Sequence, residues 1–424
     1  MSKSFFLFAF IIFFIPLQGQ PLIEKPTDTE QDSIKKEAFL KQLKKGYVST
    51  KYFSLYLRYL IKYNKYEGVR TSIGGITTND FSKKYHIKSY IAYGFNDNAL
   101  KHSTSLSFRL AKKTNSWLNL SYTDDLQESG STTFLTDKRY FQLSQPRLLN
   151  IDLFHKHITK LITLEHNISP KFLTETQLGI SDIDPTYNYG YNLNGNILNT
   201  FRISTAKIAF QWSPFSTFKT SKEKHLKTTK NSYPKFSFQY MKSFKNIFKS
   251  DFNFYKINFR TIHQIGHIEK GLSEIVLVSG ITNGNTPLTH LYHTYPNNLN
   301  RDKILKRFSV AGLTSFETMY FNEFFSDKFA MLQLKYYLKP FNFSERFKPQ
   351  LVFISRYAIG DIKTPENHQN VTFGSLNKGY NESGIELNKL FFGFGLSLNY
   401  RHGAYHLPNL DDNLAFKFTF NVTL

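Results

Sequence analysis

The chain has 424 residues, a formal net charge of +22, and 17% aromatic residues. It contains no cysteine, which excludes disulfide bonds, thiolate chemistry and a cysteine-linked lipid anchor. We expect no nucleic-acid partner despite the basic balance, because the N-terminus predicts export.

The N-terminus has the pattern of a secretory signal peptide. A basic start at Lys3 precedes an apolar run from Phe5 to Leu17, and the small residue Gly19 follows it. This pattern predicts a signal peptide over residues 1–19 that is cleaved on export. The run is too short for a membrane-spanning helix, and no later stretch is long and apolar enough to form one.

Residues 20–46 are predicted to form a periplasmic lead-in segment. The stretch is charged and weakly helical, and a short helix would place Phe39, Leu40 and Leu43 on one face. We interpret it as a short N-terminal helix or plug; the alternative is a solvated tail.

Residues 47–424 show no linker and no shift in composition, and they are predicted to form one all-β domain. Apolar and polar side chains alternate over Phe53–Leu60, Ser105–Leu110 and Phe392–Tyr400, which is the period of a strand with two different faces. At roughly 23–27 residues for each strand and its connection, the stretch predicts a single transmembrane antiparallel β-barrel of about 14–16 strands with both termini periplasmic. Turn-forming residues predict breaks at Asn96–Asn98, Ser169–Pro170, Asp182–Pro185, Ser213–Pro214 and Asn283–Gly284.

The last twelve residues, Asn413–Leu424, alternate almost without error. A closing strand with aromatic side chains facing lipid explains both the pattern and its position at the chain end. Such a strand would also be the signal that the barrel assembly machinery recognises for insertion. Its apolar positions are Phe416, Phe418, Phe420, Val422 and Leu424. The alternative is the last strand of a soluble, secreted sandwich.

Two connections are long. Ser216 to Tyr233 carries five lysines and one acid, so it is either a solvated loop or a site for lipid phosphates or an acidic partner. A second loop, from about Thr282 to Gly312, is rich in asparagine and contains two prolines. Loops of this length without their own structure are uncommon unless they have a function, and we predict that this one folds into the lumen as a plug.

Several stretches from Asn64 onward carry a resemblance to a known family. They are, in chain order, Asn64-Lys-Tyr-Glu-Gly-Val-Arg70 with Gly74, Gly75 and Thr77; Tyr93-Gly-Phe-Asn-Asp97; Phe316-Glu-Thr-Met319 with Asn322-Glu-Phe-Phe-Ser-Asp327; Glu382-Ser-Gly384; Tyr400-Arg-His-Gly-Ala-Tyr405 with Pro408; and Asp412-Asn-Leu-Ala-Phe-Lys417. Together they resemble the barrel of an uncharacterised bacterial outer-membrane family that usually follows a carboxypeptidase-regulatory-like domain. That barrel is distantly similar to the BamA/TamA (bacterial surface antigen) assembly-factor superfamily.

The resemblance covers about Tyr47 to Leu424, and the chain departs from the superfamily in two respects. The stretch before the barrel is too short for the POTRA domains of assembly factors. The superfamily's Val-Arg-Gly-Phe/Tyr loop signature is not matched, since Val69-Arg70-Thr71 lies in an early strand. The resemblance therefore implies a reduced barrel of transport or assembly type that works with a separate periplasmic or outer-membrane partner.

Charged residues inside the predicted strands should face the lumen, because Arg or Lys facing lipid at mid-depth costs about 2–4 kcal/mol. They are predicted either to form a lumen network that holds the plug or to be ordinarily solvated; the network residues are Glu67, Arg70, Glu317, Glu323, Asp327, Glu382, Arg401 and Asp412. Glu67 and Arg70 are three residues apart, so on a regular strand they would face opposite sides unless a bulge forms at Gly68.

We expect no enzyme activity, no catalytic residues, no cofactor and no metal. Common hydrolase and phosphate-binding motifs are lacking. The weaker alternatives are a metal at His155, His157 and His166, and a rim hydrolase using Asp124–Asp125 with Asp182 and Asp184. The sequence thus predicts a cell outer-membrane protein in contact with lipids and lipopolysaccharide. Its expected role is transport or assembly; the alternative is a channel or accessory subunit.

Overall fold

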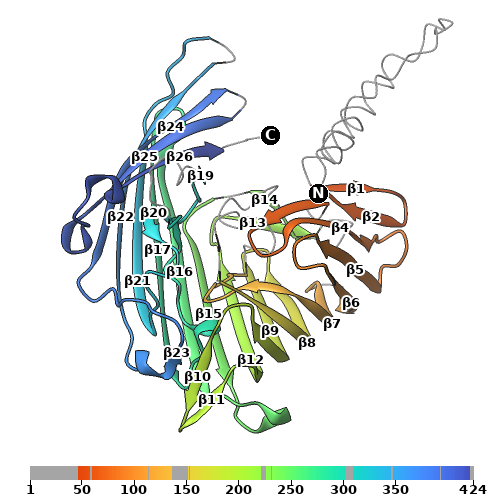
Figure 1. Ribbon diagram of the computed structural model, residues 1–424. Coiled ribbons are helices and arrows are strands. Elements are labelled where there is room, and N and C mark those ends of the chain that lie inside the picture. The colour runs from red at the N-terminus through yellow and green to blue at the C-terminus, as the bar shows by residue number, and fades with distance from the viewer. Residues whose placement is uncertain are drawn as a thin grey trace, which may run out of the picture. The chain divides into compact units, whose positions relative to one another are not determined.

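The computed structural model (Figure 1) describes residues 46–57, 60–112, 114–135, 151, 153–220, 226–230, 232–300, 309–344, 347–391 and 393–420. The chain divides into two compact units, Met1–Lys44 and Lys45–Leu424. The predicted signal peptide and nearly all of the predicted lead-in segment lie outside the described residues. Every strand within the described ranges belongs to the second unit.

This unit is all-β, as predicted. Its strands are β1 (Tyr47–Ser49), β2 (Phe53–Tyr56), β3 (Ile61–Asn64), β4 (Gly68–Thr77), β5 (Tyr85–Gly94), β6 (Ala99–Ala111), β7 (Ser116–Glu128), β8 (Phe154–Ser169), β9 (Phe172–Pro185), β10 (Gly190–Leu193), β11 (Asn196–Leu198), β12 (Phe201–Trp212), β13 (Thr217–Thr220), β14 (Leu226–Lys230), β15 (Lys235–Ser243), β16 (Phe254–His267), β17 (Gly271–Gly284), β18 (Pro296–Asn298), β19 (Ser309–Val310), β20 (Phe316–Tyr320), β21 (Lys328–Tyr337), β22 (Gln350–Asp361), β23 (His368–Gln369), β24 (Tyr380–Phe391), β25 (Phe394–His402) and β26 (Leu414–Phe420). The 3-10 turns are η4 (Ile247–Lys249), η5 (Leu288–His290), η7 (Pro365–Asn367), η8 (Gly403–Tyr405) and η9 (Leu410–Asn413). No helix among the described residues is long and apolar enough to cross a membrane.

The long strands form one antiparallel meander, in which each pairs with the next long strand along the chain. The short strands β2 and β3 both pair with β4. From β4 the order continues with β5, β6, β7, β8, β9, β12, β15, β16, β17, β21, β22, β24, β25 and β26. Figure 1 shows this sheet curving round from the red strands β1 and β2 to the blue strand β26. Because the strands alternate in direction, the connections fall into two sets. The two longest, 129–153 and 285–327, are at one end (the long-loop end), and β26 runs toward the other (the terminal end).

The two faces of the sheet differ as the alternation predicts. On β22, Val352, Ile354 and Arg356 are buried on the inner face, while Phe353 and Tyr357 are exposed on the outer face. On β26, Phe416 and Phe418 are likewise exposed, and Lys417 between them is buried. The Phe420 side chain and residues 421–424, which include Val422 and Leu424, lie outside the described residues.

Two local predictions were wrong. The alternation over Phe53–Leu60 predicts one strand, but β2 ends at Tyr56 and β3 begins only at Ile61, after a turn in which the Leu60 N–H donates to the Leu57 carbonyl. The predicted break at Asp182–Pro185 lies inside β9. Pro185 is the last residue of that strand, where its missing N–H costs little, and the carboxylate of Asp182 pairs across to Arg202 of β12.

The connection between β17 and β21 lies along the inner face of the sheet in its described parts, residues 285–300 and 309–327, which contain η5, β18, β19 and β20. Its Phe316, Met319 and Phe324 form one apolar cluster with side chains of the wall, including Met331 and Ala358. The predicted second long loop, about Thr282 to Gly312, is therefore longer than predicted and packs on the wall. We call residues 285–300 and 309–327 the inner connection.

The long-loop end is crossed by a small three-stranded sheet of β10, β11 and β23, at the bottom of the view in Figure 1. Its strands come from the connections that follow β9 and β22. The Tyr189 hydroxyl links three connections, because it lies 3.0 Å from Nδ1 of His368 and accepts from the Leu288 N–H at 2.9 Å.

Among the described residues, the two edges of the meander do not join, since no ladder connects β26 with β1, β2 or β3. The edge of β26 opposite β25 pairs instead with β19 of the inner connection, in parallel, and Figure 1 shows β19 beside β26.

Candidate functional site

The inner connection is fixed to the wall through Thr318 of β20. Its backbone N–H and its hydroxyl both donate to Oε2 of Glu382 on β24, at 2.7 and 2.6 Å. The hydroxyls of Thr318 and Tyr380 lie 2.8 Å apart. Glu382 also forms an ion pair with Arg356 of β22, and both side chains are fully buried. A strand of the connection thus shares the carboxylate that neutralises a wall arginine.

Arg356 and Glu382 belong to a polar row that crosses four adjacent strands. Gln333, Arg356, Glu382 and Arg401 are neighbours in register on β21, β22, β24 and β25. Nε of Arg356 donates to Gln333 at 2.9 Å, and its Nη1 donates to Asn399 at 3.1 Å. One glutamate therefore lies in register between two arginines, and loss of Glu382 would leave Arg356 buried without its ion-pair partner.

Arg401 makes a second anchor. Its Nη2 and Nη1 donate to the two oxygens of Glu323, at 2.6 and 3.1 Å, which is the bidentate geometry of strong charge-assisted hydrogen bonds. Glu323 follows β20, and its Oε2 also accepts from the Tyr320 N–H at 3.0 Å. The guanidinium of Arg401 lies 4.8 Å from the ring centre of Tyr380, close enough for a cation–π contact.

Glu317 and Lys417 make a third anchor. Glu317 accepts from Nδ2 of Asn297 at 2.6 Å, from the Ser315 hydroxyl at 2.7 Å, and from a backbone N–H at 3.1 Å. Lys417 of β26 donates to the Asn297 carbonyl at 2.9 Å and to the Ser309 hydroxyl at 2.8 Å. The inner connection is thus held by β22, β24, β25 and β26 together.

A separate group of charges lies at the long-loop end of β4–β7. Arg70 forms a bidentate pair with Asp125 at 2.6 and 2.9 Å and contacts Glu67 at 3.2 Å. Lys101 lies 2.8 Å from Glu67 and 2.6 Å from Asp97. Glu67 sits in the turn before β4 and reaches Arg70 from there, so no bulge within a strand is required. Gly68 takes a φ of +65° at this turn.

The eight predicted network residues therefore do not form one group. Glu317, Glu323, Glu382 and Arg401 gather around the inner connection, whereas Glu67 and Arg70 belong to the second group. Asp327 accepts from the Lys363 N–H at 2.8 Å, and Asp412 lies 3.4 Å from the Tyr320 hydroxyl.

Sequence reasoning missed Arg356, Lys417 and Lys101, and treated Asp125 only as one of two adjacent acids. Arg356 could have been predicted from its position in the strand. It lies between Ile354 and Ala358 in an alternating strand, and a charge on that apolar face must have a buried partner.

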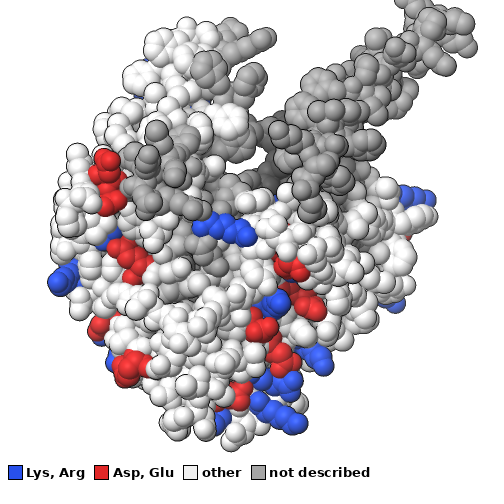
Figure 2. All heavy atoms as spheres, in the orientation of Figure 1, with Lys and Arg blue, Asp and Glu red and all other residues white. Residues whose placement is uncertain are grey.

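Three of the four predicted rim acids border an open groove at the long-loop end, of about 700 Å³. Its lining includes Asp124, Lys156, Asp182, Asp184, Arg202 and Lys249. Figure 2 shows acidic and basic side chains mixed over the lower part of this face. Arg202 pairs with Asp182 at 2.5 and 3.0 Å, so the groove combines opposite charges and is not a cluster of acids.

The three histidines considered for a metal contact three different hydroxyls. Nδ1 of His155 lies 3.1 Å from Ser129, that of His157 lies 2.8 Å from Thr159, and that of His166 contacts Ser116. Among the residues with described positions, no group of three or more His, Cys, Asp or Glu residues is arranged to hold a metal.

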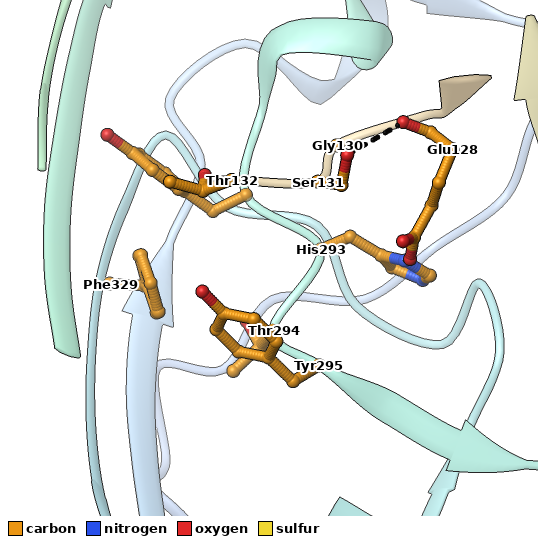
Figure 3. Close-up of a pocket in the computed structure, with 9 residues that line it drawn as sticks. Glu128, Gly130, Ser131, Thr132, His293, Thr294, Tyr295 and Phe329 are labelled. Carbon is orange, nitrogen blue, oxygen red and sulfur yellow. Dashed lines mark hydrogen bonds and ion pairs between the residues drawn. The ribbon is translucent and has the colours of Figure 1, made fainter. Parts of the chain in front are cut away.

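A small cavity of about 10 Å³ lies between the connection after β7 and the inner connection (Figure 3). Glu128, Ser131 and Thr132 line it from one side, and His293 and Tyr295 from the other. Nδ1 of His293 lies 3.8 Å from Glu128, and its ring stacks on Phe325 at 4.6 Å. A cavity of this size holds at most one water, so it is a packing junction and not a ligand site.

The fold resembles that of solved outer-membrane proteins. The BamA structure from Haemophilus ducreyi lacking POTRA domains 1-3 aligns with a TM-score of 0.51 at 12% identity, covering 84% of this chain and 68% of that one. CdiB from Acinetobacter baumannii aligns with a TM-score of 0.42 at 11% identity, covering 84% and 57%. CdiB from Escherichia coli gives 0.44 at 6% identity, covering 84% and 59%.

The structural alignment with BamA shows a shared fold, in agreement with the BamA-like resemblance of the sequence. No curated protein matches the chain. A family model described as the "Family of unknown function (DUF5686) C-terminal domain" matches residues 41–281. The match covers more than half of the sequence, and the chain therefore belongs to this family of unknown function.

Proposed function

We propose that this chain is an integral outer-membrane β-barrel of transport or assembly type, related to BamA/TamA proteins. The meander would close into a wall of about 16 strands, counting β2 and β3 as one. Its first strand and β26 would meet at a weakly paired seam. The predicted signal peptide would direct the chain to the outer membrane, where the barrel assembly machinery would insert it.

The outer face supports the membrane placement. Phe353, Ile385, Leu398 and Phe416 are neighbours in register across four strands, and all are exposed. Near the terminal end, Trp212 stacks on Phe236 with ring centres 5.2 Å apart. An apolar band bordered by aromatic side chains is typical of strands that face lipid.

The inner connection carries the functional part of the proposal. It lies on the inner face, is held by hydrogen bonds to Glu382 on β24 and by an ion pair with Arg401 on β25, and pairs through β19 with β26. In an open channel, solutes pass through the interior, so an inner connection on the inner face and a sheet of β10, β11 and β23 at the long-loop end would both obstruct it. A barrel that opens only at its seam is compatible with both features. The proposed partners are lipids, lipopolysaccharide and a separate periplasmic or outer-membrane protein.

Disulfide trapping of the seam tests this function. Cysteines would replace Phe53 or Leu55 on β2 in combination with Phe416 or Phe418 on β26. The chain has no native cysteine, so every crosslink reports the introduced pair. The matched control joins Leu398 to Phe416, which are already paired between β25 and β26. Loss of the transport or assembly activity on oxidation of the seam pair, but not of the control pair, supports the proposal. Unchanged transport or assembly activity after complete seam crosslinking contradicts it.

The alternative is a channel or an accessory subunit of another complex. Steady ion conductance of the purified protein without any client, or a stoichiometric partner on purification, would favour it. A rim hydrolase would lose activity after Asp124→Ala or Asp182→Ala.

A further inference from the structure

The connection between β15 and β16 exposes apolar side chains at the long-loop end. This connection contains η4, and we call its residues 245–249 the tip. Ile247 and Phe248 in the tip are 49% and 67% exposed. Lys245 and Lys249 flank them, and both lysines are exposed. Apolar side chains between two cations are typical of segments that enter a membrane interface, where the apolar groups lie among acyl chains and the lysines reach the headgroups.

The tip lies on the outer face of β12. Ser204 of β12 faces outward, because it is four and eight residues from the exposed outer side chains of Ile208 and Trp212. Its hydroxyl donates to the Ile247 carbonyl at 2.8 Å, and Ser204 itself is only 4% exposed. The tip therefore covers Ser204 from the lipid side, and Phe248 continues the apolar surface of the outer face toward the long-loop end.

Three residues of the tip have left-handed backbone conformations. The φ angles of Asn246, Phe248 and Lys249 are +67°, +51° and +63°. Asparagine tolerates this region, whereas phenylalanine and lysine rarely adopt it. Hydrogen bonds enforce the turn, since the Asn246 N–H donates to the Ser250 carbonyl at 2.8 Å and the Ser250 hydroxyl accepts from the Ser204 N–H at 3.0 Å. Turn chemistry and packing therefore do not explain an exposed phenylalanine at position 248.

The open groove at the long-loop end adjoins the tip, since Lys249 is one of the residues that line it. Arg202 in the same groove is neutralised by Asp182. The exposed side chains of Lys156 and Lys249, in contrast, form no ion pair with any residue whose position the structure describes. These two lysines are therefore available to an anion from outside the chain.

Basic side chains outnumber the remaining acids around the tip. The exposed lysines are Lys156, Lys160, Lys245 and Lys249. The first two share the outer face of β8, and the other two flank the apolar residues of the tip. The groove acids other than Asp182 are Asp124 and Asp184. This balance attracts an anionic group, and the ammonium of lysine, as a compact point charge, is well suited to a phosphate.

We propose that the tip and the groove form a binding site for a phosphorylated lipid of the outer leaflet. Ile247 and Phe248 enter the acyl region, while Lys156, Lys245 and Lys249 bind the phosphates of the headgroup. The inference rests on the outer-membrane placement in the proposed function, in which the long-loop end is extracellular, and it adds a defined lipid partner. The strained backbone at Phe248 keeps the ring exposed to the bilayer.

Single spin-labelled cysteines test the contact with the bilayer. The chain has no native cysteine, so a label at Phe248→Cys reports that position alone. In phosphatidylcholine vesicles that contain bisphosphorylated lipid A, this label should be more accessible to oxygen than to a water-soluble nickel complex, as should a label at Ile385 on the outer face. A label at Ile197, which is exposed on β11, should show the opposite preference. A label at Phe248 that behaves like the one at Ile197 would overturn the site.

Native mass spectrometry of the purified full chain in nonionic detergent tests the lysines, with bisphosphorylated lipid A as the probe. Lys245→Gln combined with Lys249→Gln should lower the retained lipid several-fold. Lys83→Gln combined with Lys84→Gln removes the same charge from exposed positions at the terminal end and should change retention little. Equal losses in the two double variants would contradict the proposal, and so would displacement of the lipid by inorganic phosphate alone.

Phe248→Asn tests the exposed ring and keeps the turn, because asparagine tolerates a positive φ. The variant should unfold at the same or a higher temperature than the unaltered protein and yet retain several-fold less lipid A. Undiminished retention would show that the ring does not contribute to lipid binding, against the proposal.

The spin labels also separate this inference from the proposed function. If the label at Ile385 lies in the bilayer and the label at Phe248 lies in water, the lipid site is wrong and the membrane placement stands. If both labels lie in water, the placement and the lipid site are both wrong. If depletion of the chain leaves all other barrels unchanged, the assembly role is wrong, and the spin-label and lipid-retention results still decide on the lipid site.

Discussion

Thr318 donates two hydrogen bonds to Glu382, one from its backbone and one from its side chain, although the two residues are 64 positions apart in the chain. Glu382 also pairs with Arg356 of the neighbouring strand. The carboxylate therefore serves the wall and the inner connection at the same time. Disturbing it should release the connection as well as weaken the wall.

Glu382→Ala should destabilise the barrel by about 3–5 kcal/mol, because it leaves Arg356 buried without its partner. The temperature of unfolding, followed by the mobility shift of the folded barrel on gels, measures the loss. Glu269→Ala, at an exposed turn, is the control and should change little. Equal shifts for the two variants would contradict the role given to Glu382.

Arg70→Lys should cost about 1.5–3 kcal/mol, because a lysine cannot make the paired hydrogen bonds that Arg70 donates to Asp125. Arg202→Lys is the matched control, since Arg202 makes a similar pair with Asp182 in a much more exposed position. Exposed pairs contribute less than about 1 kcal/mol. Denaturant unfolding in detergent should therefore separate the two variants, and a larger loss for Arg202→Lys would refute the assignment.

Ile385→Arg should destabilise the inserted protein by about 2–4 kcal/mol, because it places a charge on the outer face at mid-depth. Ile265 is also exposed but lies near the terminal end of β16, close to the expected membrane interface. Ile265→Arg should therefore cost only about 0–1 kcal/mol. Reversible unfolding from lipid vesicles measures both. Similar costs for the two substitutions would argue against a membrane-embedded outer face.

Lowering the pH should destabilise the small sheet of β10, β11 and β23 at the long-loop end. Burial lowers the pKa of His368 from an ordinary 6.5 to about 4. The unfolded segment binds a proton more readily than the folded one, so stability is constant above about pH 6.5 and falls as the pH drops toward 4. The loss amounts to about 3 kcal/mol.

Hydrogen exchange of the amides of β10 and β23, corrected for its intrinsic pH dependence, tracks this loss. His368→Leu should remove the pH dependence of protection. Protection that stays constant between pH 7 and 4 in the unaltered protein would show that His368 does not titrate as described.

Part of this structure follows directly from the sequence. Alternation over Phe394–Tyr400 and over Leu414–Phe418 gives both the strands and their outward side chains, because a period of two has one structural interpretation when one face is apolar. The same rule indicates that buried charges such as Glu382 and Arg401 face inward.

Contacts between side chains on different strands and connections cannot be predicted from one sequence. Arg70 meets Asp125 on a strand three positions away in the meander, and Lys417 meets Ser309 of a connection that precedes it by 108 residues. Such pairs depend on strand order, register and the path of the inner connection, and none of these leaves a local pattern. The break within β2–β3 also depends on a turn that the alternation of Phe53–Leu60 conceals.

The most direct test of the central claim is a quantitative outer-membrane proteome after depletion of this protein. An assembly-type barrel predicts that other outer-membrane β-barrels decline together while lipoproteins and inner-membrane proteins keep their amounts. Unchanged amounts of all other barrels would contradict the claim, and conductance of the purified protein would then decide whether it is a channel.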